Sequence, residues 1–279
     1  MIKRILVPLD PSQFCQAALD SAIDLAQRHD AELTAMVILD MPGIHKAIGP
    51  VPLGARHFAE TLKDAHELDA QSRIEQLISD FTSQCDRNDV KHREAEYQGI
   101  PSKLILEYAQ HFDLLCLGQE THFHFETSDR PGDSMEKILD HTATPIYAFP
   151  AGWKPVTENR RTLIAYNGSL SASRALQRYA QLMDPADTHI ILLAANMEWE
   201  IGSHYLKNAE EFLQAHGFKD VKQEWTSKSV IEAVSQTFLA EVDEVVAGSH
   251  SRRGFLDFKL GDMSRWLIRE SDKPLFLVA

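Results

Sequence analysis

The chain has 279 residues, of which 44% are hydrophobic, and a formal net charge of −13 from 28 basic and 41 acidic residues. That length corresponds to about two domains, each large enough to bury its own core. A surface this acidic repels nucleic acid and anionic lipid, which excludes both as general partners. With three scattered cysteines and no segment of signal-peptide or transmembrane character, we expect a cytoplasmic protein.

The first part of the sequence alternates between short apolar runs and amphipathic segments. Apolar runs that end in turn residues predict buried parallel strands, here at residues 5–9, 32–39, 90–97, 114–117 and 146–149. Helical spacing predicts helices at residues 17–26, 56–85, 103–110 and from Gly132 onward. Residues 40–55 are rich in Gly and Pro and are predicted to form a loop. The helix over 56–85 is expected to carry its apolar residues on one side, namely Phe58, Leu62, Ala65, Leu68, Ile74, Leu77 and Phe81.

The second part of the sequence repeats the first. The pattern that starts at Arg4 returns at Arg161, and the pattern that starts at Asp113 returns at Asp243. A long internal period of this kind indicates duplication. The second copy is shorter, and we assign the missing residues to the loop and long helix after its second strand. Residues 151–160 are polar with Gly and Pro, so they are the expected linker between a domain of residues 1–150 and a shorter one of residues 161–279.

Strands that alternate with helices predict an α/β fold, with right-handed crossovers and a parallel sheet covered on both faces. In such sheets ligands bind beyond the carboxyl ends of the strands, where the strand order reverses. A glycine loop leading into a helix N-terminus is a phosphate-binding layout, because free N–H groups and the helix dipole point to one space. Three stretches per copy converge there: Asp10, Gly118 and Gly132 in the first, and Asn167, Gly248 and Gly261 in the second.

In combination, several stretches resemble the universal stress protein family in its tandem, two-domain form. They are residues 5–12, Gly99-Ile100-Pro101, Gly248–Ser264 and Lys273–Val278, and the resemblance covers nearly the whole chain. It implies two tandem five-stranded, Rossmann-like domains of the nucleotide-binding α-hydrolase-like kind. It also implies an ATP site built from an Asp after the first strand and a motif G-x2-G-x9-G-(S/T), with at most slow ATP hydrolysis. The sequence has no nucleophile elbow, Walker motif or H-E-x-x-H motif, so strong catalysis is not expected.

Both copies depart from this motif. In the second copy Ser251 replaces a glycine, Asp262 replaces the Ser/Thr and Asn167 replaces the Asp; the first copy keeps Asp10 but has Thr121 and Asp133. An aspartate beside a triphosphate repels it unless Mg²⁺ or arginines compensate. The predicted nucleotide-binding residues are Asp10, Gly118, Gly132, Ser134, Asn167, Gly248, Ser251, Arg252, Arg253, Gly261 and Ser264.

The favoured hypothesis is a stress-response protein that binds ATP, AMP or a related small ligand, with Mg²⁺ as a candidate accompanying ion. A first alternative is a degenerate tandem scaffold that binds no ATP. A second is zinc binding by His122 and His124, which point the same way if their segment is extended, together with Cys116. The two copies are expected to pack as an intramolecular pseudo-dimer, and further association into a homodimer is compatible with the sequence.

Overall fold

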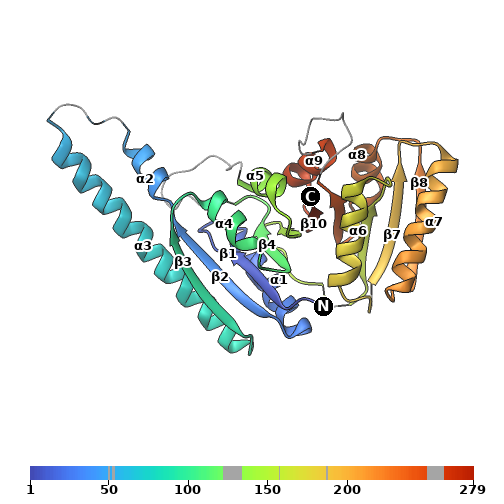
Figure 1. Cartoon of the computed structure of the whole chain (residues 1–279), viewed down its shortest axis with the longest axis horizontal. Helices are drawn as coiled ribbons and strands as arrows, with labels where there is room; N and C mark the ends of the chain where they lie inside the picture. The colour runs from blue at the N-terminus through green and yellow to red at the C-terminus, as the bar shows by residue number, and fades with distance from the viewer. Residues whose placement is uncertain (50, 52–53, 122–133, 157, 187, 250–260) are drawn as a thin grey trace.

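The structure is a computed structural model that describes all residues except 50, 52–53, 122–133, 157, 187 and 250–260. Its described residues form one ten-stranded sheet with helices on both faces (Figure 1). The strands of the first half are β1 (Arg4–Pro8), β2 (Glu32–Leu39), β3 (His92–Gln98), β4 (Leu114–Gly118) and β5 (Ile146–Phe149). Those of the second half are β6 (Arg160–Ala165), β7 (Thr188–Ala195), β8 (Asp220–Thr226), β9 (Glu244–Gly248) and β10 (Leu275–Val278).

The strand order is β3-β2-β1-β4-β5-β10-β9-β6-β7-β8, so the second half repeats the order of the first in reverse. Strands pair in parallel within each half, whereas β5 and β10 pair antiparallel, with Phe276 opposite Tyr147. Each half has the five strands predicted for it, and the β5–β10 pair joins the two sets into one sheet. The reason is that β5 and β10 are otherwise edge strands with unpaired backbone groups, and pairing them removes both edges.

The helices form two layers, as the two apolar clusters on either side of the sheet show. One layer contains α1 (Cys15–His29), α2 (Met41–Ile48), α3 (Arg56–Arg87), α6 (Leu170–Leu182) and α7 (Trp199–Ala215). The other contains α4 (Pro101–Ala109), α5 (Ser134–His141), α8 (Val230–Ala233) with its π-helical continuation η1 (Val234–Phe238), and α9 (Asp262–Glu270). With helices on both faces, the predicted α/β class is confirmed.

The predicted loop over residues 40–55 was wrong in part, because α2 occupies its first half. The Asp40 carboxylate accepts a hydrogen bond from the backbone N–H of Gly43 at 3.0 Å, and Pro42 stands in the first turn. Asp at the N-cap and Pro in the first turn are helix-start signals. The prediction counted Pro and Gly only as helix breakers.

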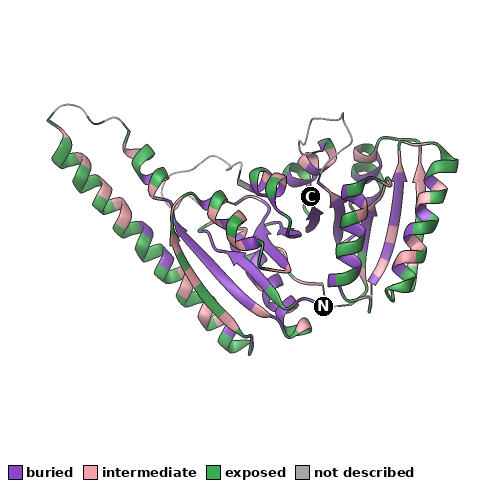
Figure 2. Ribbon diagram, in the orientation of Figure 1, coloured by how far each residue is buried: buried purple, intermediate pink, exposed green. Residues whose placement is uncertain are grey.

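The long helix α3 does not carry its apolar residues on one side, contrary to the prediction. Ala70, Ile74 and Phe81 are buried against the sheet, whereas Phe58 is 71% exposed. At 3.6 residues per turn, Phe58 lies about 160° around the helix from Ile74. The first turns of α3 extend beyond the sheet, and Figure 2 shows them as exposed. The apolar stripe of the N-terminal half therefore faces away from the core.

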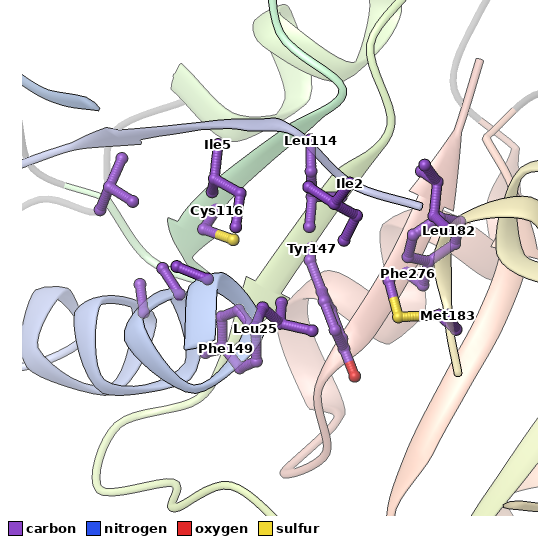
Figure 3. Close-up of a cluster of buried hydrophobic side chains, with 14 of the residues drawn as sticks. Ile2, Ile5, Leu25, Leu114, Cys116, Tyr147, Phe149, Leu182, Met183 and Phe276 are labelled. Atoms are coloured by element: carbon purple, nitrogen blue, oxygen red, sulfur yellow. The ribbon is translucent and has the colours of Figure 1, made fainter. Parts of the chain in front are cut away.

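A buried polar cluster lies where the two halves meet. The Glu244 carboxylate of β9 is 1% exposed and accepts hydrogen bonds from the hydroxyls of Tyr147 on β5 and Tyr179 on α6. The Thr162 hydroxyl of β6 donates a further bond at 2.6 Å. Figure 3 shows the Tyr147 ring among apolar side chains, with its hydroxyl at the edge of the cluster. Tyr147 thus ties the first half to a charge in the second.

Arg160 supplies the counter-charge in this cluster. Burial alone would lower its pKa, but Glu244, and after it Tyr147, Tyr179 and Asp24, together raise the pKa above the ordinary value. Burial, followed by the charge of Glu244, raises the pKa of Tyr147 and of Tyr179 well above the ordinary value. Both phenols therefore stay protonated and donate to the carboxylate.

Candidate functional site

Those predicted site residues that the structure describes lie where the strand order reverses. β1 pairs with β4 in the first half, and β6 pairs with β9 in the second. The residues that follow these strands form matching turns: Asp10 Oδ1 accepts from the N–H of Ser12 at 3.1 Å, and Asn167 Oδ1 accepts from the N–H of Ser169 at 3.0 Å. The chain thus builds the same strand-to-helix connection twice.

A pocket of about 550 Å³ opens at this position in the second half. The ends of β6, β7 and β9 form its floor, and the starts of α6, α8 and α9 form its walls. Among the predicted residues it contains Asn167, Gly248, Gly261 and Ser264. The other lining residues are Ala165, Tyr166, Ser169, Ser171, Ala172, Leu193, Ala195, Asn196, Met197, Ser229, Val230, Ile231, Ala247, Asp262 and Met263.

Two helix N-termini face this pocket. Ser169 caps α6, where its Oγ accepts from the N–H of Ala172 at 3.3 Å, and Gly261 is the N-cap of α9. The first N–H groups of a helix carry partial positive charge and attract anions. The Ser229 hydroxyl accepts from the N–H of Glu232 at 3.2 Å, which leaves its own hydrogen available to donate toward the pocket. The lining therefore suits a negatively charged group.

Glycine is required at the end of β9 by close packing. A Cβ built on Gly248 would lie 2.5 Å from the carbonyl carbon of Ser171 and 2.6 Å from the backbone nitrogen of Ala172. The Ser264 hydroxyl donates to the carbonyl oxygen of Gly248 at 2.9 Å, and the Gly261 N–H donates to Ser249 at 2.7 Å. These bonds fix the start of α9 against the end of β9. The Ser264 hydrogen is used in this bond, so Ser264 positions the loop and does not itself donate to a ligand.

The corresponding place in the first half is packed differently. A Cβ built on Gly118 would lie 2.4 Å from the Cβ of Phe14. Gln119, the next residue, donates a side-chain hydrogen bond at 2.5 Å to the carbonyl oxygen of Lys273 in the second half. Asp10 is 2% exposed and its carboxylate also accepts from the Ser12 hydroxyl at 2.6 Å. At this place the first half therefore has Phe14 against its glycine and a carboxylate that accepts hydrogen bonds from its own turn.

Seven of the predicted residues lie wholly or partly outside the described part of the chain. Ser134 begins α5, and its side chain is outside what the structure describes. Outside the described residues altogether lie Gly132, Ser251, Arg252, Arg253, His122 and His124.

The third proposed zinc ligand, Cys116, is described and lies in the apolar core. Its side chain is 0% exposed and sits beside Ile5 and Leu114 (Figure 3). Burial raises the pKa of the Cys116 thiol, which disfavours the thiolate that binds metal. Within the described part of the chain no group of three or more His, Cys, Asp or Glu side chains could hold a metal ion. The described residues therefore give the zinc hypothesis no support.

Three serines that line the pocket were not among the predicted site residues. Ser169 and Ser171 come from the start of α6, and Ser229 precedes α8. Ser169 and Ser229 are helix N-caps, and a serine just before an apolar periodic segment is a recognised N-cap signal. This signal, read just after the strand ends of the second copy, predicts both Ser169 and Ser229 as N-caps.

Comparison with known proteins agrees with this architecture. A model of the universal stress protein family matches residues 1–148. The structure of a universal stress protein from Archaeoglobus fulgidus DSM 4304 aligns over 99% of this chain and 97% of that chain, with 17% identity and a TM-score of 0.69. A putative universal stress protein from Pseudomonas aeruginosa UCBPP-PA14 aligns over 99% and 93%, with 14% identity and a TM-score of 0.59. A search of curated proteins gave no match. Among the described residues, no helix combines the length and apolar character needed to cross a bilayer.

Proposed function

The chain belongs to the universal stress protein family, and on that premise we propose that it binds a nucleotide such as ATP or AMP in the pocket of the second half, as part of a stress response and without strong catalysis. The observation that carries the proposal is the pocket itself. It has about 550 Å³, and the N-termini of α6 and α9 face it. Small-molecule sites typically have about 300–1,000 Å³ and a few convergent polar groups.

The roles of the lining residues follow from their positions. Phosphate groups would lie between the N-terminus of α9 and the Ser229 hydroxyl, which both line the pocket. The exposed Asn167 amide, at the end of β6, offers a donor and an acceptor to a base or ribose. Tyr166 and Met197 supply apolar surface for the rest of the ligand.

Asp262 limits the charge that the pocket accepts. It lies in the first turn of α9 and lines the pocket, so its carboxylate repels a triphosphate. Mg²⁺ prefers carboxylate and phosphate oxygens, and Asp262 could share such an ion with the ligand. The proposal therefore includes Mg²⁺ with ATP, whereas AMP requires less compensation.

The test uses isothermal titration calorimetry with ATP and with AMP, each with and without Mg²⁺. The informative variant is Ser229→Asp, with Ser229→Asn as its matched control. Asp and Asn are both good N-caps and similar in size, so each retains the cap of α8 and only Asp adds charge. We expect Ser229→Asn to bind with nearly unchanged affinity, and Ser229→Asp to bind at least about fivefold more weakly, the effect of roughly 1 kcal/mol of repulsion.

Equal affinities of the two variants would show that the ligand's phosphates do not lie near this wall. If the unaltered protein takes up neither nucleotide, the scaffold alternative replaces nucleotide binding.

A further inference from the structure

We propose that the two crevices are not equivalent and that the nucleotide binds only in the second half. There, Ser171 and Ser229 leave space and supply hydroxyl groups. The corresponding residues of the first half are Phe14 and Ile100. The inference rests on the proposed function. It adds a stoichiometry of one nucleotide per chain and names the residues that set it.

The equivalence of these positions is structural. Gly118 ends β4 and Gly248 ends β9, and a Cβ on either would strike the first turn of the neighbouring helix. In the first half the nearest atom is the Cβ of Phe14, and in the second it belongs to Ser171. Phe14 and Ser171 therefore occupy the same place against their glycines.

The size of the side chain at this place differs greatly. Ser171 is 8% exposed and lines the pocket, with its Oγ 2.7 Å from the position that a Cβ on Gly248 would take. Phe14 is half-buried and lies outside the two apolar clusters of the described residues. A phenyl ring at the position of Ser171 would fill space that the ligand needs. In the first half the residue at that place is Phe14.

A second pair shows the same change in chemistry. Ser229 is the N-cap of α8 and Ile100 is the N-cap of α4, and each lies in the connection between the third strand of its half and the next helix. Ser229 presents a hydroxyl to the pocket, whereas Ile100 is 40% exposed and makes no capping hydrogen bond.

A third pair follows the same rule in the helices α5 and α9. Ser264, Leu267 and Ile268 are the buried residues of α9. Met135, Ile138 and Leu139 are buried with the same spacing in α5, so Met135 stands where Ser264 stands. Methionine cannot donate the hydrogen bond with which Ser264 holds Gly248. At three places, then, the first half replaces a serine of the pocket with an apolar residue.

The experiment measures nucleotide stoichiometry by calorimetry on the full chain with ATP and Mg²⁺ and with AMP. We expect one site in the unaltered protein. Ser171→Phe should weaken binding at least about tenfold, because the added ring overpacks the site. Phe14→Ser/Ile100→Ser, changed at half-buried and exposed positions, should raise the stoichiometry from one to two. Circular dichroism checks that both variants are folded, and the double variant keeps the test decisive if Ser171→Phe does not fold.

Three results would overturn the inference while leaving nucleotide binding intact. They are two sites in the unaltered protein, a folded Ser171→Phe that binds with the original affinity, or a Phe14→Ser/Ile100→Ser variant that still binds a single nucleotide. Failure of the proposed function gives a different result, because the unaltered protein would then bind no nucleotide at all.

Discussion

Tyr147 and Glu244 join the two halves, and replacing either should destabilise the whole sheet. Tyr147→Phe keeps the ring and its packing but removes the hydroxyl that donates to Glu244 across the junction. A hydrogen bond to a charged group contributes about 1.5–3 kcal/mol, so we expect a loss of about 2 kcal/mol in the free energy of unfolding. Tyr179 and Thr162 still donate to the carboxylate, so the loss should stay below the cost of a fully unpaired buried charge.

A double-mutant cycle isolates the interaction between the halves. Glu244→Gln keeps the shape of the side chain and removes its charge, and the cycle compares it with Tyr147→Phe and with the double variant. Because the two groups are in direct contact, we expect a coupling energy of about 1–2 kcal/mol. Urea denaturation followed by tryptophan fluorescence supplies the four free energies.

Tyr166→Phe is the matched control for the cycle. Its hydroxyl lies 3.3 Å from the Ser173 hydroxyl in a part-buried, uncharged setting, so its loss should cost at most about 1 kcal/mol. A coupling energy below about 0.5 kcal/mol between Tyr147 and Glu244 would refute the view that this bond holds the halves together.

Three further predictions follow from single sites. In α3, Phe81→Ala should lower the free energy of unfolding by about 3–5 kcal/mol in urea denaturation, since Phe81 is 0% exposed. Phe58→Ala should change it by no more than about 0.5 kcal/mol, and equal losses would contradict the burial of only one side of the helix. Asp262→Ser should tighten ATP binding without Mg²⁺ by about fivefold in calorimetry, because roughly 1 kcal/mol of repulsion disappears; unchanged affinity would place the phosphates elsewhere. Burial, and then the N-terminal ammonium, lower the pKa of His29 below its ordinary value of 6.5, so the unfolded chain takes up the proton first. The free energy of unfolding therefore falls as the pH drops through 6.5 toward the pKa of the folded state. His29→Gln should make this fall less steep in urea midpoints measured over a pH series, and an unchanged slope would contradict the prediction.

Most of the fold could be predicted from local patterns. Apolar runs such as residues 5–9 and 114–117 are nearly continuous because their strands are buried on both faces, which marks a parallel sheet. The repeat then predicted the second half. The junction could not be predicted, because β5 and β10 are short apolar strands whose pairing is long-range. The two faces of α3 were missed for a related reason: a helix that leaves the sheet need not keep its apolar stripe on the packed side.

The candidate site was predicted in position but not in composition. Asn167, Gly248 and Gly261 follow from glycine loops at strand ends, and the structure brings them together in one pocket. Ser229 could be recognised as an N-cap, but Ser171 carries no such signal, and only the structure shows that both line the pocket. Phe14 carried no signal, since one phenylalanine after a strand is compatible with ordinary packing.

The two halves differ around Glu244 and at their strand-end crevices for the same physical reason. Around Glu244 the second half places Thr162 and Tyr179, whereas the matching positions of the first half hold Leu114, Ile5 and Ala22. Two identical halves would repeat the carboxylate on both sides of the β5–β10 pair, and each buried charge carries a desolvation penalty of several kcal/mol. A single chain avoids the second penalty, because each half can hold one member of a hydrogen-bonded pair. The same freedom allows the second half to hold Ser171 where the first half holds Phe14, a difference that two copies of one domain could not have.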